Sequence, residues 1–277
     1  MSNLPIKSAN KSKSVSVAAY LKNDAITKRI NELLGARAGQ FTTSLITAVN
    51  ESEKLAECEP RSVLNAALTA SSMDLPINQN LGFAYLVPYR DNRKGVTLCQ
   101  FQMGYKGFVQ LAQRSGFYKT INASDVREGE IVGQDRLSGE IEFKWIEDDA
   151  EREQKPIAGY VAYIKMLNGF EKTLYWSKEK VLNHAQQYSK SFAKYGTGLW
   201  KEQFDLMAKK TVLKSLLNGW GILSTELQTA IKFDQTIDGE YDDNPKRKPE
   251  LTQEEREAIE DEATNIADEL IEEAESE

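Results

Sequence analysis

The spacing of apolar residues changes twice along the chain, from helical spacing to strand-like runs and back again. Residues 15–73 read as helices, and Pro60 opens the last of them at its first turn. Residues 83–89 and 96–101 read as two strands joined by a polar turn, which predicts a β-hairpin. The order of helices, hairpin, helix, strands and helices predicts an α+β fold, in which the β-hairpin and an antiparallel sheet are backed by helices.

Short elements are predicted directly after the hairpin. A helix over 105–115 comes first, and Gly116 ends it. Strand-like runs then follow at 118–126, 140–145, 157–167 and 170–176. Asn168-Gly169, between the last two runs, is a typical two-residue hairpin turn.

A helical pattern returns after these strands. Ser177 is a suitable N-cap for the first of the helices. The longest is predicted over 199–217, with Asn218-Gly219 as its stop, and another is predicted from Ser224. An acidic helical stretch is predicted over 253–275.

Charge is distributed unevenly between the body of the chain and its C-terminal end. The whole sequence has 35 Lys and Arg against 42 Asp and Glu, a net charge of −7. Residues 234–277 hold 18 of the acids and only 4 of the bases, so residues 1–233 carry a net charge of +7. A basic body favours a polyanion partner, although a solvated surface with a charged terminus has the same composition.

The sequence lacks the catalytic, phosphate-binding and zinc-binding motifs that most enzyme classes need. His184, its one histidine, lies in a polar helical stretch without a catalytic motif around it. No Gly-x-x-x-x-Gly-Lys-Ser/Thr phosphate loop is present, which disfavours an ATP-driven reaction, and no Cys and His set could bind structural zinc. We therefore expect no catalytic residue, no cofactor and no metal site.

The two cysteines and the apolar runs bear on where the protein acts. Cys58 and Cys99 lie far apart in sequence and fit buried thiols in a reduced cytosol. No uncharged apolar run approaches the ~18 residues of a membrane span, so no membrane partner is expected.

One set of residues keeps an enzyme alternative open. Asp125, Glu142 and Lys144 form an Asp…Glu-x-Lys set on adjacent strand-like runs, a spacing typical of nucleases that hold Mg²⁺ between two carboxylates. The same residues alternate with apolar ones, as on any solvated strand face. A metal-dependent nuclease using these three residues is therefore the alternative to a non-catalytic protein.

The predicted helix 105–115 has a polar face without acids. That face holds Lys106, Gln110, Gln113 and Arg114. Because a solvated helix face usually mixes both signs of charge, this pattern indicates contact with phosphate. Gly104 and Gly107 allow close approach of another backbone, either that of DNA or that of a packed neighbour.

The predicted helix 199–217 is apolar almost all round. Its narrow polar strip holds Gln203, Lys210 and Lys214, and these lysines are expected to reach out toward a phosphate backbone. Asp205 lies four residues from Lys201 and from Lys209 and is predicted to pair with them.

Aromatic residues interleave with cations around the hairpin. Single strands expose the faces of their bases, so aromatic residues beside cations favour single-stranded DNA, while core aromatics would give the same pattern. The predicted DNA-binding residues are Tyr85, Arg90, Gln102, Tyr105, Lys106, Gln110, Arg114, Gln203, Lys210 and Lys214.

Several motifs, in the same order along the chain, resemble those of the RecT family of phage and prophage recombinases. They are Asp74-Leu75-Pro76-Ile77, Asn80-Leu81-Gly82-Phe83-Ala84-Tyr85-Leu86-Val87-Pro88-Tyr89, Gln100-Phe101-Gln102-Met103-Gly104-Tyr105-Lys106-Gly107, Val126-Arg127-Glu128-Gly129-Glu130, Gly159-Tyr160, Tyr175-Trp176, Trp200, and Met207-Ala208-Lys209-Lys210-Thr211-Val212-Leu213. The resemblance covers roughly residues 30–235.

This resemblance implies a function and a set of partners. The function is ATP-independent annealing of complementary single strands in phage homologous recombination, with the protein assembled as a ring or helical filament. The implied partners are single-stranded DNA, the annealed duplex intermediate, further copies of the chain, an exonuclease and the host single-strand-binding protein. It also implies the bacterial host cytoplasm and a core related to eukaryotic strand-annealing proteins.

Pattern and resemblance together predict four regions. These are a disordered basic tail at 1–14, a helical oligomerisation region at 15–73, a DNA-binding and annealing α+β core at 74–233, and an acidic, partly helical tail at 234–277. The apolar seam of that tail is Ile259, Ile266, Leu270 and Ile271. The tail is predicted to tune DNA affinity and to dock a partner, and a solubilising tail is the alternative.

Overall fold

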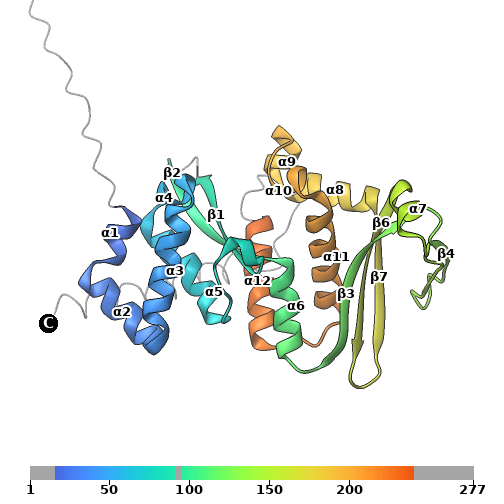
Figure 1. Ribbon diagram of the computed structural model, residues 1–277, viewed down its shortest axis with the longest axis horizontal. Helices are drawn as coiled ribbons and strands as arrows, with labels where there is room; N and C mark the ends of the chain where they lie inside the picture. Colours follow the sequence, from blue (N-terminus) through green and yellow to red (C-terminus); the bar gives the residue numbers. More distant parts are fainter. Residues whose placement is uncertain (1–15, 92–94, 240–277) are drawn as a thin grey trace, which may run out of the picture. The chain divides into compact units, whose positions relative to one another are not determined.

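The computed structural model describes residues 16–91 and 95–239, drawn in Figure 1 with their elements labelled. The chain divides into two compact units. The described part of the first comprises residues 16–69, 86–91 and 95–100, and that of the second comprises 70–85 and 101–239. The hairpin strands β1 (Ala84–Asp91) and β2 (Val96–Met103) contribute residues to both units.

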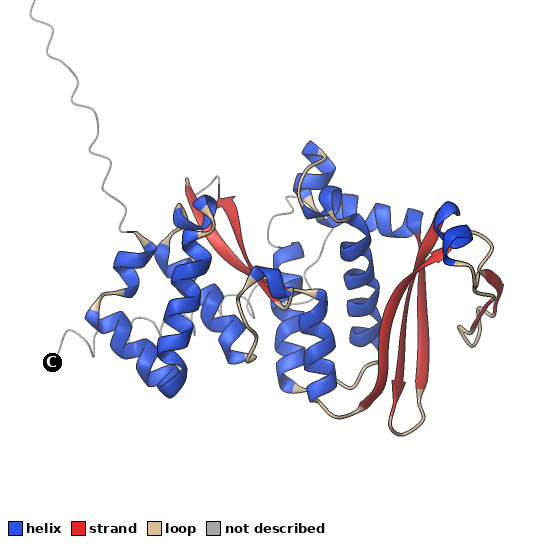
Figure 2. Ribbon diagram, in the orientation of Figure 1, coloured by secondary structure: helices blue, strands red, loops and turns tan. Residues whose placement is uncertain are grey.

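Helices dominate the first unit, as Figure 2 shows. They are α1 (Val17–Leu21), α2 (Asp24–Leu34), the 3-10 turn η1 (Gly35–Arg37), α3 (Ala38–Asn50), α4 (Glu53–Ala56) and α5 (Pro60–Ser72), which continues into the second unit. Ser16, Asn23 and Ser52 cap α1, α2 and α4 by accepting hydrogen bonds from backbone N–H groups. Leu45 and Leu55 are completely buried in its core.

Within this unit, β2 is attached to the start of α5. The backbone N–H of Cys99 donates to Ser62 Oγ at 2.9 Å, and the N–H of Glu59 donates to the carbonyl of Thr97 at 2.8 Å. Cys58 and Cys99 are both buried free thiols, which confirms the prediction for them. Burial, assisted by Glu57, raises the pKa of Cys58 to about 11, so this thiol stays protonated at neutral pH.

An antiparallel sheet of three strands forms the centre of the second unit. The strand order is β3 (Tyr118–Arg127), β6 (Ile157–Met166) and β7 (Glu171–Ser177). In this register Tyr160 of β6 lies opposite Asp125 of β3 and Trp176 of β7. A separate two-stranded sheet pairs β4 (Ile131–Gln134) with β5 (Ile141–Phe143).

One face of the three-stranded sheet is covered by α11 (Phe204–Trp220), which contacts all three strands (Figure 1). Along β6 the alternate residues Tyr160, Ala162 and Ile164 are completely buried, as expected for the covered face. The other elements of this unit are η2 (Gln79–Leu81), α6 (Tyr105–Arg114), α7 (Asp149–Gln154), α8 (Lys178–Tyr188), α9 (Lys190–Tyr195), α10 (Leu199–Glu202) and α12 (Thr225–Gly239). Helix α6 contacts both α11 and α12.

The structure confirms the predicted α+β fold and most of its elements. The N-caps at Ser177 and Ser224 are present, since their hydroxyls accept from Lys180 N–H and Leu227 N–H. The predicted helix 199–217 is interrupted at Gln203, whose backbone is not helical, and α11 then runs through Gly219 to Trp220. Strand β4, of four residues, and helix α7, of six, were not predicted, because segments this short lack a clear apolar period.

Only part of the predicted division into regions falls on residues that the structure describes. Residues 1–14 and the predicted helical stretch 253–275 lie outside the described residues. The predicted boundary between 233 and 234 falls inside α12. No helix in the described ranges combines the length and the apolar character needed to cross a membrane.

Candidate nucleic-acid interface

The start of α6 is packed against the loop that precedes β1. A Cβ atom at Gly104 would collide with the carbonyl of Gly82, and one at Gly107 would collide with the carbonyl of Phe83 and with Met103 Sδ. The N–H of Gly104 donates to the carbonyl of Phe83 at 2.9 Å. The sequence left two possibilities for the backbone beside these glycines, DNA or a packed neighbour. The structure shows a packed neighbour, the backbone of the same chain.

Two predicted residues in the first turn of α6 differ in exposure. Lys106 is exposed, and no described acid forms an ion pair with it. Tyr105 is half-buried, and burial raises its pKa, while a backbone hydrogen bond from Ala123 of β3 lowers it. Lys106 is therefore available to phosphate, whereas the Tyr105 hydroxyl links α6 to strand β3.

Farther along α6, Arg114 already has partners within the chain. Its guanidinium donates to the carbonyls of Met73 at 2.9 Å and Asp74 at 2.8 Å, and it lies 3.5 Å from the Asp74 carboxylate. It thus satisfies carbonyls that follow the end of α5. Gln110 is half-buried, and its Oε1 has no hydrogen-bond partner among the described residues.

Lys210 and Lys214 do not reach outward as the helical pattern suggested. Lys210 Nζ lies 2.9 Å from Asp234 Oδ1, and Lys214 Nζ lies 2.7 Å from Asp234 Oδ2. Lys210 is 7% exposed and Asp234 is 4% exposed. Burial raises the pKa of Asp234, but the two ammonium groups outweigh it and hold that pKa below its usual range. In this conformation the carboxylate of α12 occupies the place expected for a phosphate.

The other predicted residues belong to different elements of the two units. Arg90, in the first unit, is exposed and donates to Thr97 Oγ1 at 3.3 Å. In the second unit, Tyr85 lies beside Gly82 and Gly104, and Gln102 is half-buried on β2. Gln203 is exposed at the junction of α10 and α11.

A stronger combination of cations and aromatic rings lies in α8, α9 and α10, which we call the α8–α10 segment. Among its described side chains, the exposed cations are Lys178, Lys180, Lys194 and Lys201. Lys180 Nζ lies 4.4 Å from the ring centre of Trp176, and Lys194 Nζ lies 5.3 Å from that of Tyr195, which is 67% exposed. In the sequence, lysines outnumber acids between Lys178 and Lys214, which could have indicated this surface. Of those lysines, only Lys210 and Lys214 of α11 were among the predicted DNA-binding residues.

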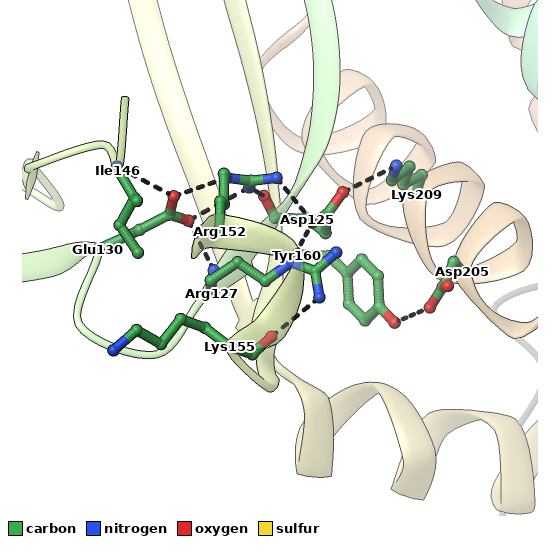
Figure 3. Close-up of polar contacts among 9 residues, drawn as sticks. All are labelled: Asp125, Arg127, Glu130, Ile146, Arg152, Lys155, Tyr160, Asp205 and Lys209. Carbon is green, nitrogen blue, oxygen red and sulfur yellow. Dashed lines mark hydrogen bonds and ion pairs between the residues drawn. The ribbon is translucent and has the colours of Figure 1, made fainter. Parts of the chain in front are cut away.

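A dense polar network joins β3, β6, α7 and α11 (Figure 3). Asp125 on β3 binds Arg127 at 3.0 Å, Arg152 at 3.3 Å and Lys209 at 3.1 Å. Glu130, completely buried, binds Arg152 at 2.7 Å. Despite the opposing effect of burial, these hydrogen bonds and cations hold the pKa of both carboxylates below the usual range.

The same network corrects one predicted pairing. Lys209 binds Asp125, and Asp205 instead accepts a hydrogen bond from the Tyr160 hydroxyl at 2.5 Å. Burial first, and then this hydrogen bond to Asp205, raises the pKa of Tyr160.

The nuclease alternative gains no support from this geometry. Asp125 belongs to the three-stranded sheet, whereas Glu142 is exposed on β5 of the other sheet. Asp125 is already engaged by three cations. Within residues 16–91 and 95–239, no three His, Cys, Asp or Glu side chains are grouped so that they could hold a metal ion.

Comparison with known proteins gives a consistent identification. The sequence model of the RecT family matches residues 39–250. The chain is 42% identical over 229 residues to the uncharacterized protein YqaK of Bacillus subtilis (strain 168), covering 83% of this chain and 74% of that protein. It is 28% identical over 194 residues to protein RecT of Escherichia coli (strain K12), covering 68% of each. The chain therefore belongs to the RecT family.

Proposed function

We propose that this protein binds single-stranded DNA and anneals complementary strands without ATP. Membership of the RecT family implies single-strand annealing in recombination, and the match over residues 39–250 is the observation that carries the proposal. Base pairing supplies the free energy of annealing, so the protein needs only to hold strands and reduce the repulsion between their phosphates. The absence of a phosphate-loop motif from the sequence agrees with a reaction that uses no nucleotide.

The DNA surface that we propose combines Lys106 with the α8–α10 segment. These cations are exposed, and Tyr195 offers an exposed ring on which a base can stack. The chain partners of Arg114, Lys210 and Lys214 argue for structural roles in the conformation described here. Tyr85, Arg90, Gln102, Tyr105, Gln110 and Gln203 stay candidates for contact with bases or sugars.

Replacing Lys180 or Lys194 by alanine is expected to weaken binding to all single-stranded sequences alike. Loss of one phosphate contact should reduce the slope of log K against log salt by about 0.7 and lower affinity several-fold at low salt. Fluorescence anisotropy with labelled oligonucleotides at several salt concentrations measures both quantities. Lys165→Ala is the matched control, because Lys165 Nζ is engaged by Glu171 at 2.9 Å. Equal salt slopes for Lys180→Ala, Lys194→Ala and the control would reject this surface.

We also propose that the protein acts as an oligomer, a ring or filament, in a phage or prophage recombination system of the bacterial cytoplasm. One short chain covers few nucleotides, so a stable duplex nucleus needs neighbouring subunits on the strand. Helices of residues 15–73 are the proposed subunit contact. A partner exonuclease and the host single-strand-binding protein are the proposed further partners.

Annealing of two complementary labelled oligonucleotides is expected to proceed equally well with and without ATP. The assay measures energy transfer between the strands, while mass photometry follows assembly before and after the second strand is added. Parallel samples with Mg²⁺ and with EDTA are run on a denaturing gel, where intact strands are expected in both. An absolute requirement for ATP would overturn the annealing proposal, and Mg²⁺-dependent shortening lost in Asp125→Asn would favour the nuclease.

A further inference from the structure

Five large apolar side chains remain exposed at one end of the three-stranded sheet. They are Phe117, Leu167, Phe170, Trp220 and Ile222, with exposed fractions between 38% and 68%, and we call them the sheet-end patch. Single exposed apolar residues are normal in soluble proteins, but a group of five is typical of a binding surface.

Contacts between three segments of the chain hold the sheet-end patch together. The N–H of Leu167 donates to the carbonyl of Phe117 at 3.0 Å. The hydroxyl of Tyr118 donates to the carbonyl of Ile222 at 2.9 Å. In Figure 1 the start of β3, the β6–β7 turn and the end of α11 lie at this same end of the second unit. The patch is therefore built from neighbouring, hydrogen-bonded segments.

Two lysines border the sheet-end patch. Lys119 is exposed next to Phe117, and Lys172 Nζ lies 4.8 Å from the ring centre of Trp220. Within 117–119, 167–172 and 220–222 the one acid is Glu171, which accepts hydrogen bonds from Tyr163 at 2.6 Å and Lys165 at 2.9 Å. An apolar surface with lysines at its rim fits an occupant that is both apolar and acidic.

We propose that the sheet-end patch binds the acidic C-terminal segment, residues 253–275, of the same chain. This segment has eleven acids and one base, Arg256. At about 100° per residue, Ile259, Ile266 and Leu270 fall on one side of a helix, with acids around them. The segment therefore carries an apolar seam and a charge complementary to the lysine rim.

The length of the connecting chain permits this contact. Ile222 belongs to the patch, and α12 begins three residues later and runs through 15 residues, about 22 Å, to Gly239. Residues 240–252 number thirteen and can extend over at most about 45 Å, so the acidic segment can return along the full length of α12. A second copy's patch is a poorer occupant, because its lysine rim would face Lys119 and Lys172.

Photo-crosslinking in the full-length chain tests the proposal. p-Benzoylphenylalanine replaces Leu167 in the patch or, as a control, Tyr195 of α9, since their exposed fractions are 68% and 67%. After illumination, peptides crosslinked to each position are identified by mass spectrometry. From position 167 we expect crosslinks to residues 253–275 in products with the mass of one chain. Substituting Ile266→Asp and Leu270→Asp together should reduce this yield at least tenfold.

The control position separates this contact from simple attraction of the tail to lysines. Position 195 lies in the α8–α10 segment among exposed lysines, so a tail held by charge alone would crosslink there at least as well. That result would overturn the proposal, as would crosslinked products with the mass of two chains or crosslinks from position 167 that miss residues 253–275. Circular dichroism confirms that each variant is folded, and the test does not depend on annealing activity.

Discussion

Asp234→Asn is expected to lower the free energy of unfolding of the second unit by about 3–5 kcal/mol, the usual cost of removing one partner from a buried ion pair. Asp234 is 4% exposed, and its carboxylate is the acceptor for both Lys210 and Lys214. Asparagine has nearly the same shape but no charge. The variant therefore keeps two ammonium groups in a buried site without their counter-charge.

Urea unfolding followed by tryptophan emission measures this effect in the right unit. The four tryptophans, Trp145, Trp176, Trp200 and Trp220, all belong to the second unit. Glu179→Gln on the exposed surface of α8 is the matched control and should change stability by less than about 0.5 kcal/mol. A loss below about 1 kcal/mol in Asp234→Asn would contradict a stabilising pair.

A triple variant tests whether apolar residues can replace this buried cluster of three charges. Lys210→Met, Lys214→Met and Asp234→Val together remove all three charges and change the total side-chain volume little. Because a buried ion pair can often be replaced by apolar residues without loss, this variant should recover most of the stability lost in Asp234→Asn. If it does, and if its DNA affinity matches that of the unmodified protein, Lys210 and Lys214 are not phosphate contacts.

The pH dependence of stability follows from the depressed pKa of Asp234. Its folded pKa lies below the unfolded value of about 3.9. The ionised Asp234 carboxylate therefore contributes to folding stability above pH 4, and this contribution is lost as the pH falls through the folded pKa. Asp234→Asn should accordingly show a flatter decline of stability in acid than the unmodified chain, although Asp125 and Glu130 keep part of that decline.

Elements with a strong local pattern could be predicted from the sequence. The hairpin β1–β2 and strands β3, β6 and β7 combine apolar alternation with polar or glycine-containing turns, and Gly169 in the β6–β7 turn has a φ of +91°. The break between α10 and α11 could not be predicted in this way. Residues 199–218 contain neither proline nor glycine, and the interruption at Gln203 is a backbone conformation rather than a change of composition.

The candidate site was harder to predict, because its pairings are not local. A helical wheel shows which residues share a face, but not which face is buried. Lys210 meets a carboxylate 24 residues away, and Arg114 meets carbonyls 40 and 41 residues away. Lys209 binds Asp125 rather than its helix neighbour Asp205. Tertiary contacts thus replaced the local pairs that sequence spacing suggests.

Arg152→Ala is expected to lower the stability of the second unit by about 2–3 kcal/mol, somewhat less than Asp234→Asn because the Arg152 side chain is 20% exposed. Arg152 of α7 donates to Glu130 at 2.7 Å and to the carbonyl of Asp125 at 2.8 Å (Figure 3). It thereby connects α7, the residue before β4 and strand β3. Without it, the completely buried Glu130 retains only the backbone N–H groups of Arg127 and Ile146 as donors.

A double-mutant cycle with Glu130→Gln isolates the contribution of this ion pair. If Arg152 acts through Glu130, the combined variant should lose at least about 1 kcal/mol less than the sum of the two single losses. Urea unfolding with tryptophan emission again gives the measurement, and Lys155→Ala at the exposed end of α7 is the control. Purely additive losses would show that Arg152 stabilises the unit mainly through Asp125. In either case DNA affinity should stay within about twofold of the unmodified chain in folded samples, because the network faces α7, β3 and α11 rather than the exposed lysines of the α8–α10 segment.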